Sequence, residues 1–547
     1  MKKINLSKLL FTSAFLLASQ NSLAFTPLKE QKLRYSNGPA PESLDPSLIT
    51  GIPESRIVDN LFEGLTLLHP TTEAPMAGAA ESWTVSPDGK TYTFKIRKDA
   101  TWSDGKPLKA QDFIYAWTRT LNPVTGSRYA GELYYIVDAE AINTGKEKDF
   151  SKLGAKAIDD KTLEVKLNNP TPFFLTLLSH YVYYPQPQHV VEKHNTKWTQ
   201  AKNIVSNGAY VLTEREINKH LKLTKNPKYW DAKNVAITEA LVTPIEINKT
   251  GYNFFRSKKI DWFPQTPTDI IPILQKKQKN SKKYVPLVIK PMLGVYFYRV
   301  NTTKKPFDDV RVRRALAITI NRDVLVNNVT KAGEVPALTL TPRIGNYFYE
   351  NSTLSPKVTD KEIAEAKNLL AEAGFKDGKG FPKINLLYNT REDHKKIAIK
   401  MQSMWKKYLG LQVELENKEW ASYLESQRAL KYDVSRAGWI GDYPDPYNFL
   451  GLFLSNSHSN QTGWKNAEFD KHLELSSKTL DPKERAQHLL NAEKVLMREL
   501  PIIPIYFYTT KQLVAEKIKT RLPDGTIAKY NPGTQDKVVL KNLILAK

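Results

Sequence analysis

Residues 433–447 read Asp-Val-Ser-Arg-Ala-Gly-Trp-Ile-Gly-Asp-Tyr-Pro-Asp-Pro-Tyr, a short apolar strand that runs into a turn. A cation (Arg436), a flat aromatic ring (Trp439) and an anion (Asp442) stand within seven residues. Charge-assisted hydrogen bonds in an enclosed site are strong. The set therefore suits a zwitterion with an extended backbone, whose ammonium meets Asp442 and whose carboxylate meets Arg436. The alternative is a surface ion pair beside a turn.

The backbone between these two charges is also informative. Gly438 and Gly441 have only hydrogen as side chains, so another backbone is able to lie close against them. We therefore expect the segment from Ala437 to Gly441 to offer amide hydrogen bonds to an extended ligand.

The residues upstream of this stretch predict an α/β lobe. Strands are expected over 383–388, 412–416 and 432–437, and a long helix over 393–408 that Gly410 ends. An earlier helix is expected over 361–373, with Gly374 after it in the left-handed conformation. In sheets of this kind ligands bind beyond the carboxyl ends of the strands. The segment from Arg436 to Asp442 is expected at such an end.

A second region, residues 81–120, predicts a β-hairpin followed by a helix. Residues 91–97 alternate polar and apolar side chains as a half-buried strand does. Turn residues precede this strand at 86–89 and follow it at 103–107, and residues 110–117 have helical periodicity.

The first 24 residues predict export from the cytoplasm. Three lysines precede a short apolar run at 9–18, and small residues stand at 22–24. We expect residues 1–24 to be a cleaved signal peptide, the alternative being an amphipathic helix. The chain contains no cysteine, so we expect neither a lipid anchor on a cleavage-site cysteine nor disulfides. The expected location is the periplasm.

Length and charge limit the classes of protein. The 547 residues exceed what one core usually supports, so two or three domains are expected. The formal net charge of +23 becomes 23 − 3 = +20 without the three signal lysines. Because the basic residues are dispersed rather than aligned with aromatic ones, we expect a solvated surface and no nucleic-acid partner. Attraction to anionic lipid or acidic ligands is the alternative.

The chain has no catalytic signature. It lacks the G-x-S-x-G, H-E-x-x-H, P-loop and dinucleotide-binding motifs, and it offers no cysteine nucleophile. Its nine histidines are scattered without metal-ligand spacing. We therefore expect a protein that is not an enzyme and that uses no cofactor and no metal.

Several motifs together resemble one known family. In chain order they are Ser43-Leu44-Asp45-Pro46, Glu81-Ser82-Trp83, Trp102-Ser103-Asp104-Gly105-Lys106-Pro107, Asn207-Gly208-Ala209-Tyr210, Asn226-Pro227-Lys228-Tyr229-Trp230-Asp231 and Pro306-Phe307-Asp308-Asp309. They are similar to motifs of the extracellular solute-binding proteins of peptide ABC importers, solute-binding protein family 5. Arg436-Ala437-Gly438-Trp439 with Asp442 resembles the oligopeptide-binding, OppA-like branch.

The resemblance implies an α/β, two-lobed periplasmic-binding-protein (clamshell) fold with an extra third domain, in a monomer. It implies a domain I of residues 25–62, 188–293 and 508–547, a domain II of residues 63–187 and a domain III of residues 294–507. An oligopeptide is then enclosed between domains I and III by hinge closure, with crossings near 287–294 and 506–508. An inner-membrane ABC permease is the implied partner.

The resemblance also implies a set of ligand-binding residues. Asp442 matches the position that holds the ammonium of the peptide. Arg436 and His394 match positions that meet the carboxylates of short peptides. The remaining implied positions are Gly438 and Ile440 for backbone pairing, Ile52 opposite them, Trp439 and Tyr129 for side-chain pockets, and His180 for a further pocket.

The chain departs from the family pattern at four positions. Basic residues are expected at 330 and 427, where this chain has Thr330 and Gln427 with Lys331 and Arg428 beside them. The family pattern has an acidic residue near position 50, where this chain has Thr50. Members of the family can have a half-cystine at the position of Ile440. On a strand, a shift of one residue turns a side chain to the other face. Whether Lys331 and Arg428 reach the ligand is left open.

Three functions are compatible with these observations. The leading hypothesis is a non-enzymatic receptor that captures oligopeptides by backbone pairing and tolerates varied side chains in hydrated pockets. The second is a receptor of the same fold for another ligand, such as murein peptide, haem or an antimicrobial peptide. The third is a periplasmic peptidase or chaperone.

Overall fold

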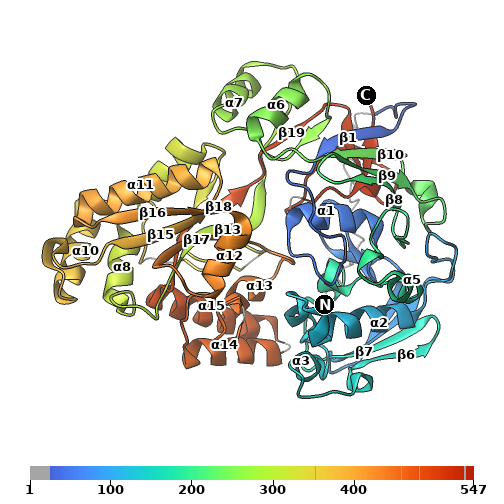
Figure 1. Ribbon diagram of the computed structural model, residues 1–547, viewed down its shortest axis with the longest axis horizontal. Coiled ribbons are helices and arrows are strands. Elements are labelled where there is room, and N and C mark those ends of the chain that lie inside the picture. The colour runs from blue at the N-terminus through green and yellow to red at the C-terminus, as the bar shows by residue number, and fades with distance from the viewer. Residues whose placement is uncertain (1–24, 346, 351–352, 458, 480, 535–536) are drawn as a thin grey trace, which may run out of the picture.

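The chain forms two lobes in this computed structural model, which describes residues 25–345, 347–350, 353–457, 459–479, 481–534 and 537–547. One lobe, blue to green with the red C-terminal strands, lies beside a second lobe coloured yellow to red (Figure 1). The expected signal peptide lies outside the described residues. Within these ranges, no helix combines the length and the apolar character needed to span a bilayer.

The first lobe contains a seven-stranded sheet and a four-stranded sheet. In spatial order the larger sheet comprises β12 (Leu287–Val288), β19 (Gln512–Val514), β11 (Trp262–Phe263), β1 (Lys32–Ser36), β10 (Glu239–Thr243), β9 (His220–Lys225) and β8 (Tyr210–Glu216). The smaller, antiparallel sheet comprises β4 (Ala80–Val85), β5 (Thr91–Ile96), β7 (Thr162–Lys166) and β6 (Ala155–Asp159). The predicted hairpin and the helix after it are confirmed as β4–β5 and α2 (Ala110–Leu121).

The second lobe is built on a six-stranded mixed sheet. Its spatial order is β14 (Val335–Pro336), β18 (Ile502–Thr509), β13 (Pro291–Val300), β17 (Val434–Ile440), β15 (Ile384–Asn389) and β16 (Val413–Lys418). The strands β16, β15 and β17 run parallel, whereas β17, β13, β18 and β14 are antiparallel neighbours. The helices α8 (Val310–Ile318), α10 (Asp360–Glu372) and α11 (Glu392–Leu409) belong to this lobe (Figure 1).

The predicted elements of the second lobe are largely confirmed. Gly410 and Gly374 have positive φ after α11 and α10, as the sequence indicates. The helix α12 (Trp420–Arg428), which lies between β16 and β17, was not predicted from the sequence. The prediction that Arg436 lies at the end of a strand is wrong. Pairing with β13 extends β17 to Ile440, so Arg436 lies inside the strand.

The chain passes between the two large sheets twice. After β12 it enters β13, and after β18 it returns to β19. The first crossing falls within the predicted range 287–294. The second lies at Thr510–Lys511 rather than at 506–508, because β18 continues to Thr509. At this crossing, Nζ of Lys511 lies 2.6 Å from Oε1 of the buried Glu334.

The remaining elements complete the two lobes. In the first lobe they are α1 (Ile52–Leu61), β2 (Thr66–Leu68), β3 (Pro75–Ala77), α3 (Ala139–Asn143), α4 (Phe174–Leu177), α5 (Gln188–His194), α6 (Asn248–Arg256), α7 (Ile271–Asn280), β20 (Ile518–Arg521), β21 (Ile527–Lys529) and β22 (Leu543–Leu545). In the second lobe they are α9 (Arg322–Val324), α13 (Tyr447–Leu450), α14 (Ala467–Lys478) and α15 (Pro482–Glu499).

Each lobe has an apolar core of its own, in which a buried tryptophan finds a hydrogen-bond partner. In the first lobe, the buried Trp117 donates its indole N–H to the carbonyl of Tyr183 at 3.0 Å. In the second lobe, the buried Trp405 donates to the carbonyl of Leu316, also at 3.0 Å. Both tryptophans thus avoid the cost of a buried donor without a partner.

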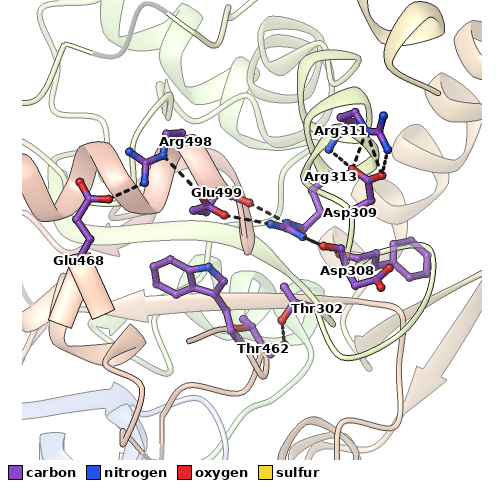
Figure 2. A network of polar contacts seen from close by, with 11 residues as sticks. Thr302, Asp308, Asp309, Arg311, Arg313, Thr462, Glu468, Arg498 and Glu499 are labelled. Atoms are coloured by element: carbon purple, nitrogen blue, oxygen red, sulfur yellow. Dashed lines mark hydrogen bonds and ion pairs between the residues drawn. The ribbon is translucent and has the colours of Figure 1, made fainter. Parts of the chain in front are cut away.

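A network of charged side chains joins α8 to α15 in the second lobe (Figure 2). The nearly buried Arg313 of α8 donates to the carbonyl of Glu499 at 2.8 Å and to those of Phe307 and Asp308 at 2.9 Å. Arg498 extends the network to Glu468 on α14, at 2.8 Å. These bonds hold the helices against each other beside the sheet.

Glu493 is a fully buried acid in α15. Its carboxyl group accepts the backbone N–H of Thr341 at 2.8 Å and the hydroxyl of Tyr347 at 2.6 Å. Burial raises its pKa from the usual 4.5 to about 7. The folded protein therefore favours the protonated acid.

We predict that Glu493 makes the folded state less stable as pH rises from about 4.5 to about 7. An acid whose pKa is raised in the folded state contributes most below its unfolded pKa and loses that contribution as it ionises. Glu493→Gln keeps an acceptor for Thr341 and carries no charge. At pH 8 it is expected to raise the free energy of unfolding by roughly 1–3 kcal/mol in urea denaturation.

The control is Glu140→Gln, which changes an exposed glutamate of α3. This variant is expected to retain the pH dependence of the wild type. If the stability of Glu493→Gln changes with pH as steeply as that of the control, the prediction that Glu493 is protonated in the folded state is wrong.

Candidate functional site

The candidate site begins at an edge of β17. On one side β17 pairs with β13 along its whole length, from Val434 to Ile440. On the other side it pairs with β15 only at Val434 and Ser435. In the part of the chain that the structure describes, no strand continues this second side beyond Ser435.

The hydrogen bonds on either side of β17 show which backbone groups are directed to this open edge. The backbone N–H of Gly441 donates to the carbonyl of Leu293 in β13 at 2.7 Å. The backbone N–H and C=O groups of the odd-numbered residues of β17, such as Ala437, therefore point toward β13. The carbonyl of Arg436 faces the other way and accepts the side-chain amide of Gln427 at 2.9 Å. The backbone groups of Gly438 and Ile440 therefore point away from β13, toward the open edge.

Arg436 lies on one face of the sheet among tyrosines. It is 9 % exposed, and its guanidinium donates to the hydroxyl of Tyr508 at 2.8 Å and lies 4.7 Å from the ring centre of Tyr296. Among the described residues it forms no ion pair, and its Nε has no hydrogen-bond partner. A buried cation without an acidic partner has an electrostatic environment that suits an external carboxylate.

His394 belongs to the same group of side chains. It is 4 % exposed, and its ring centre lies 5.6 Å from that of Tyr296. Burial, and then the charge of Arg436, lower its pKa well below the usual value, so the imidazole is neutral at pH 7. The structure thus brings together the two residues predicted to meet a carboxylate.

The tyrosines around Arg436 were missed by the sequence analysis. They come from β13 and β18, where Tyr296 and Tyr506 stand directly opposite each other with stacked rings. The sequence could have indicated these tyrosines, because the motif Tyr-Phe-Tyr occurs at both 296–298 and 506–508. Alternation places the two tyrosines of each motif on one face of the sheet.

Gly438 has a packing reason to be glycine. A Cβ at this position would lie 2.5 Å from the Tyr508 hydroxyl and 3.3 Å from Nη2 of Arg436. The missing side chain therefore leaves room for the hydrogen bond between those two residues. Next to the same strand, the side-chain carbonyl of Asn448 accepts from the Trp439 indole at 2.8 Å and from the Asp442 backbone at 3.1 Å. Asn448 is a further residue that the sequence did not single out.

Asp442 lies in a second group, which includes residues of the first lobe. One of its carboxylate oxygens is 3.3 Å from Nε2 of His180, whose side chain is only 3 % exposed. The His180 ring stacks on Tyr129 with a centroid separation of 5.4 Å. Three predicted site residues, distant in the sequence, therefore meet where the two lobes approach each other.

A second acid stands close to this group. Glu132 follows Tyr129 in the first lobe, and one of its carboxyl oxygens is buried without a hydrogen-bond partner among the described residues. Burial, and then the nearby charge of Asp442, raise its pKa to about 8. At pH 7 the folded protein therefore favours the protonated form of Glu132, and a cation placed beside the two acids would favour its ionisation.

Among the described residues, Ile52, Lys331 and Arg428 form no hydrogen bond or ion pair with either of these two groups. Ile52 is the first residue of α1 and is half-buried. Lys331 is exposed with positive φ, whereas Thr330 beside it is buried and bonded to Glu334 at 2.8 Å. Arg428 is exposed at the end of α12. A contact of Lys331 or Arg428 with a ligand stays a prediction.

Comparison with known proteins shows the family to which this chain belongs. Residues 74–461 match the family model of bacterial extracellular solute-binding proteins, family 5. The chain belongs to this family. It is 41 % identical over 505 residues to the periplasmic oligopeptide-binding protein OppA of Escherichia coli, covering 91 % of each chain.

Solved structures of relatives match the fold over nearly the whole chain. A crystal structure of Haemophilus influenzae OppA in complex with the peptide RPPGFSPFR matches with a TM-score of 0.86 at 36 % identity, covering 95 % of this chain and 100 % of that one. The Escherichia coli murein tripeptide-binding protein MppA also matches with a TM-score of 0.86, at 35 % identity and with 95 % and 99 % covered. The two-lobed, three-domain family fold predicted from the sequence is confirmed.

A second structure of MppA indicates how the lobes are arranged. Its unliganded open form matches this chain with a TM-score of only 0.72, at the same 35 % identity and with 96 % and 99 % covered. Since the two MppA structures belong to one protein, the lower score reflects a different arrangement of its parts. The lobes of the present structure are therefore not in that open arrangement.

Proposed function

We propose that this protein is a periplasmic receptor that encloses oligopeptides in extended form between its lobes and delivers them to an inner-membrane ABC permease. The observation that carries the proposal is the open edge of β17, where the backbone of Gly438 and Ile440 faces away from the sheet. An extended peptide adds to such an edge by backbone hydrogen bonds, which do not depend on its sequence.

The two charged groups set the direction of the bound peptide. Asp442, with His180 beside it, receives the ammonium at one end of the edge. Arg436, with His394 and the tyrosines, receives the carboxylate of a short peptide. Trp439 and Tyr129 line pockets for side chains, and Ile52 approaches the peptide from the first lobe.

The crossings between the sheets support a hinge. The chain crosses between the two large sheets at residues 289–290 and 510–511. We therefore propose the domain division predicted from the sequence, with the boundaries between domains I and III moved to these crossings, so that domain III covers residues 291–509. Rotation about the crossings opens and closes the space between the lobes. The protein is proposed to act without catalysis, as a monomer in the periplasm after removal of residues 1–24.

We predict that Asp442 recognises the free amino end of the peptide. Acetylation removes the ammonium charge and leaves the rest of the peptide unchanged. Because a hydrogen bond to a charged group contributes about 1.5–3 kcal/mol, calorimetry is expected to show a loss of at least tenfold in affinity for the acetylated peptide. With Asp442→Asn, the difference between the free and the acetylated peptide is expected to shrink. Equal affinity of the wild type for both peptides would remove Asp442 from the site.

We predict that Arg436 recognises the carboxylate of tripeptides. Arg436→Met keeps an apolar side chain of similar length and removes the charge. It is expected to weaken binding of a tripeptide at least tenfold, because a charged partner is lost in a buried site where that loss costs about 2–5 kcal/mol. The same tripeptide with an amidated carboxyl end is the control, since its affinity is expected to change little. An equal loss for both ligands would show that Arg436 only supports the fold.

A further inference from the structure

An aromatic contact joins the two lobes outside the groups of residues assigned to the ligand. The ring of Phe173, from the first lobe, stacks on Tyr443 of the second lobe, with centroids 4.6 Å apart and planes 10° from parallel. Tyr447 lies on the same ring at 6.2 Å and 25°. We call these three residues the closing stack. Tyr443 is 1 % exposed and Phe173 is 9 % exposed, so their rings are enclosed by protein.

Polar contacts hold the closing stack in place. The hydroxyl of Tyr135, from the first lobe, lies 3.2 Å from that of Tyr443. Asp445 accepts two hydrogen bonds from Arg485 of α15, at 2.8 and 2.9 Å. The guanidinium of Arg485 in turn lies 5.5 Å from the ring centre of Phe173. A cation near an aromatic ring adds to the attraction between the lobes.

The closing stack is directly connected to the ammonium group of the site. Tyr443 follows Asp442 in the chain, and Asp442 is itself in contact with His180 of the first lobe. The same short turn of the second lobe thus touches the first lobe at a charged contact and at an apolar one. When the lobes separate, both contacts break together.

We propose that the closing stack determines the affinity for every ligand of this protein without touching any ligand. The inference rests on the proposed peptide receptor. Stacked rings at 4.6 Å leave no room for a ligand atom between them, so the stack contributes equally whichever peptide is bound. It favours the closed arrangement, and observed affinity scales with the population of that arrangement.

The test is Phe173→Leu, which keeps an apolar side chain but removes the stacking. Calorimetry is carried out with a tripeptide, a pentapeptide of different sequence and the N-acetylated tripeptide. The variant is expected to weaken binding of all three by one common factor, about two- to tenfold. The ratio between free and acetylated tripeptide stays as in the wild type. Tyr447→Leu is also expected to weaken binding of all three peptides by one common factor, which is smaller than that of Phe173→Leu.

The matched control is Phe375→Leu. Phe375 packs edge-on against Phe381 at 4.9 Å, and both residues lie within the second lobe. This variant is expected to leave all three affinities unchanged. Urea denaturation of each variant shows whether the folded state is retained, so a loss of binding through unfolding is recognised.

The outcomes separate this inference from the proposed function. If the wild type binds none of the peptides, the proposed function fails. If the wild type binds and Phe173→Leu changes the three affinities by different factors, Phe173 acts as a pocket residue and the inference is wrong. Affinities that equal those of the Phe375→Leu control also overturn it, while the peptide receptor stands.

Discussion

The structure of the site depends on the one-sided pairing of β17. Full pairing with β13 fixes the direction of every backbone group between Val434 and Ile440, and the early end of the pairing with β15 leaves alternate groups unused by the sheet. Backbone N–H and C=O groups that lose water need a partner. In the proposed function, closure of the first lobe over this edge is therefore costly unless an extended peptide fills it.

In the proposed function, two charged groups determine the direction in which a peptide binds along this edge. Arg436 and Asp442 lie in separate groups, one formed by tyrosines of the second lobe and the other shared with His180 and Tyr129 of the first lobe. In the proposed function, the ammonium and the carboxylate of an extended peptide lie against these two groups. Recognition of the two ends in this way does not require a particular side chain of the peptide.

Local patterns predicted much of the fold. The helix α11 and the strand β15 follow from periodicity and from Gly410, because those signals lie within the elements themselves. The end of β17 was misplaced because its partner β13 lies far away in the sequence. The contact between Asp442 and His180 depends on the approach of two lobes, and only the family resemblance pointed to both residues. Asn448 and Tyr508 carry no local signal of their roles, although the repeated Tyr-Phe-Tyr motif marks the strands that meet.

The most direct test of this account is native mass spectrometry of the protein purified without refolding. A receptor that binds peptides through their backbone and their two charged ends is expected to carry a series of co-purified peptides of different masses. These are released together when the lobes are opened by mild denaturation. A single discrete mass that is not a peptide would contradict the account, because it would show that the open edge of β17 serves another ligand.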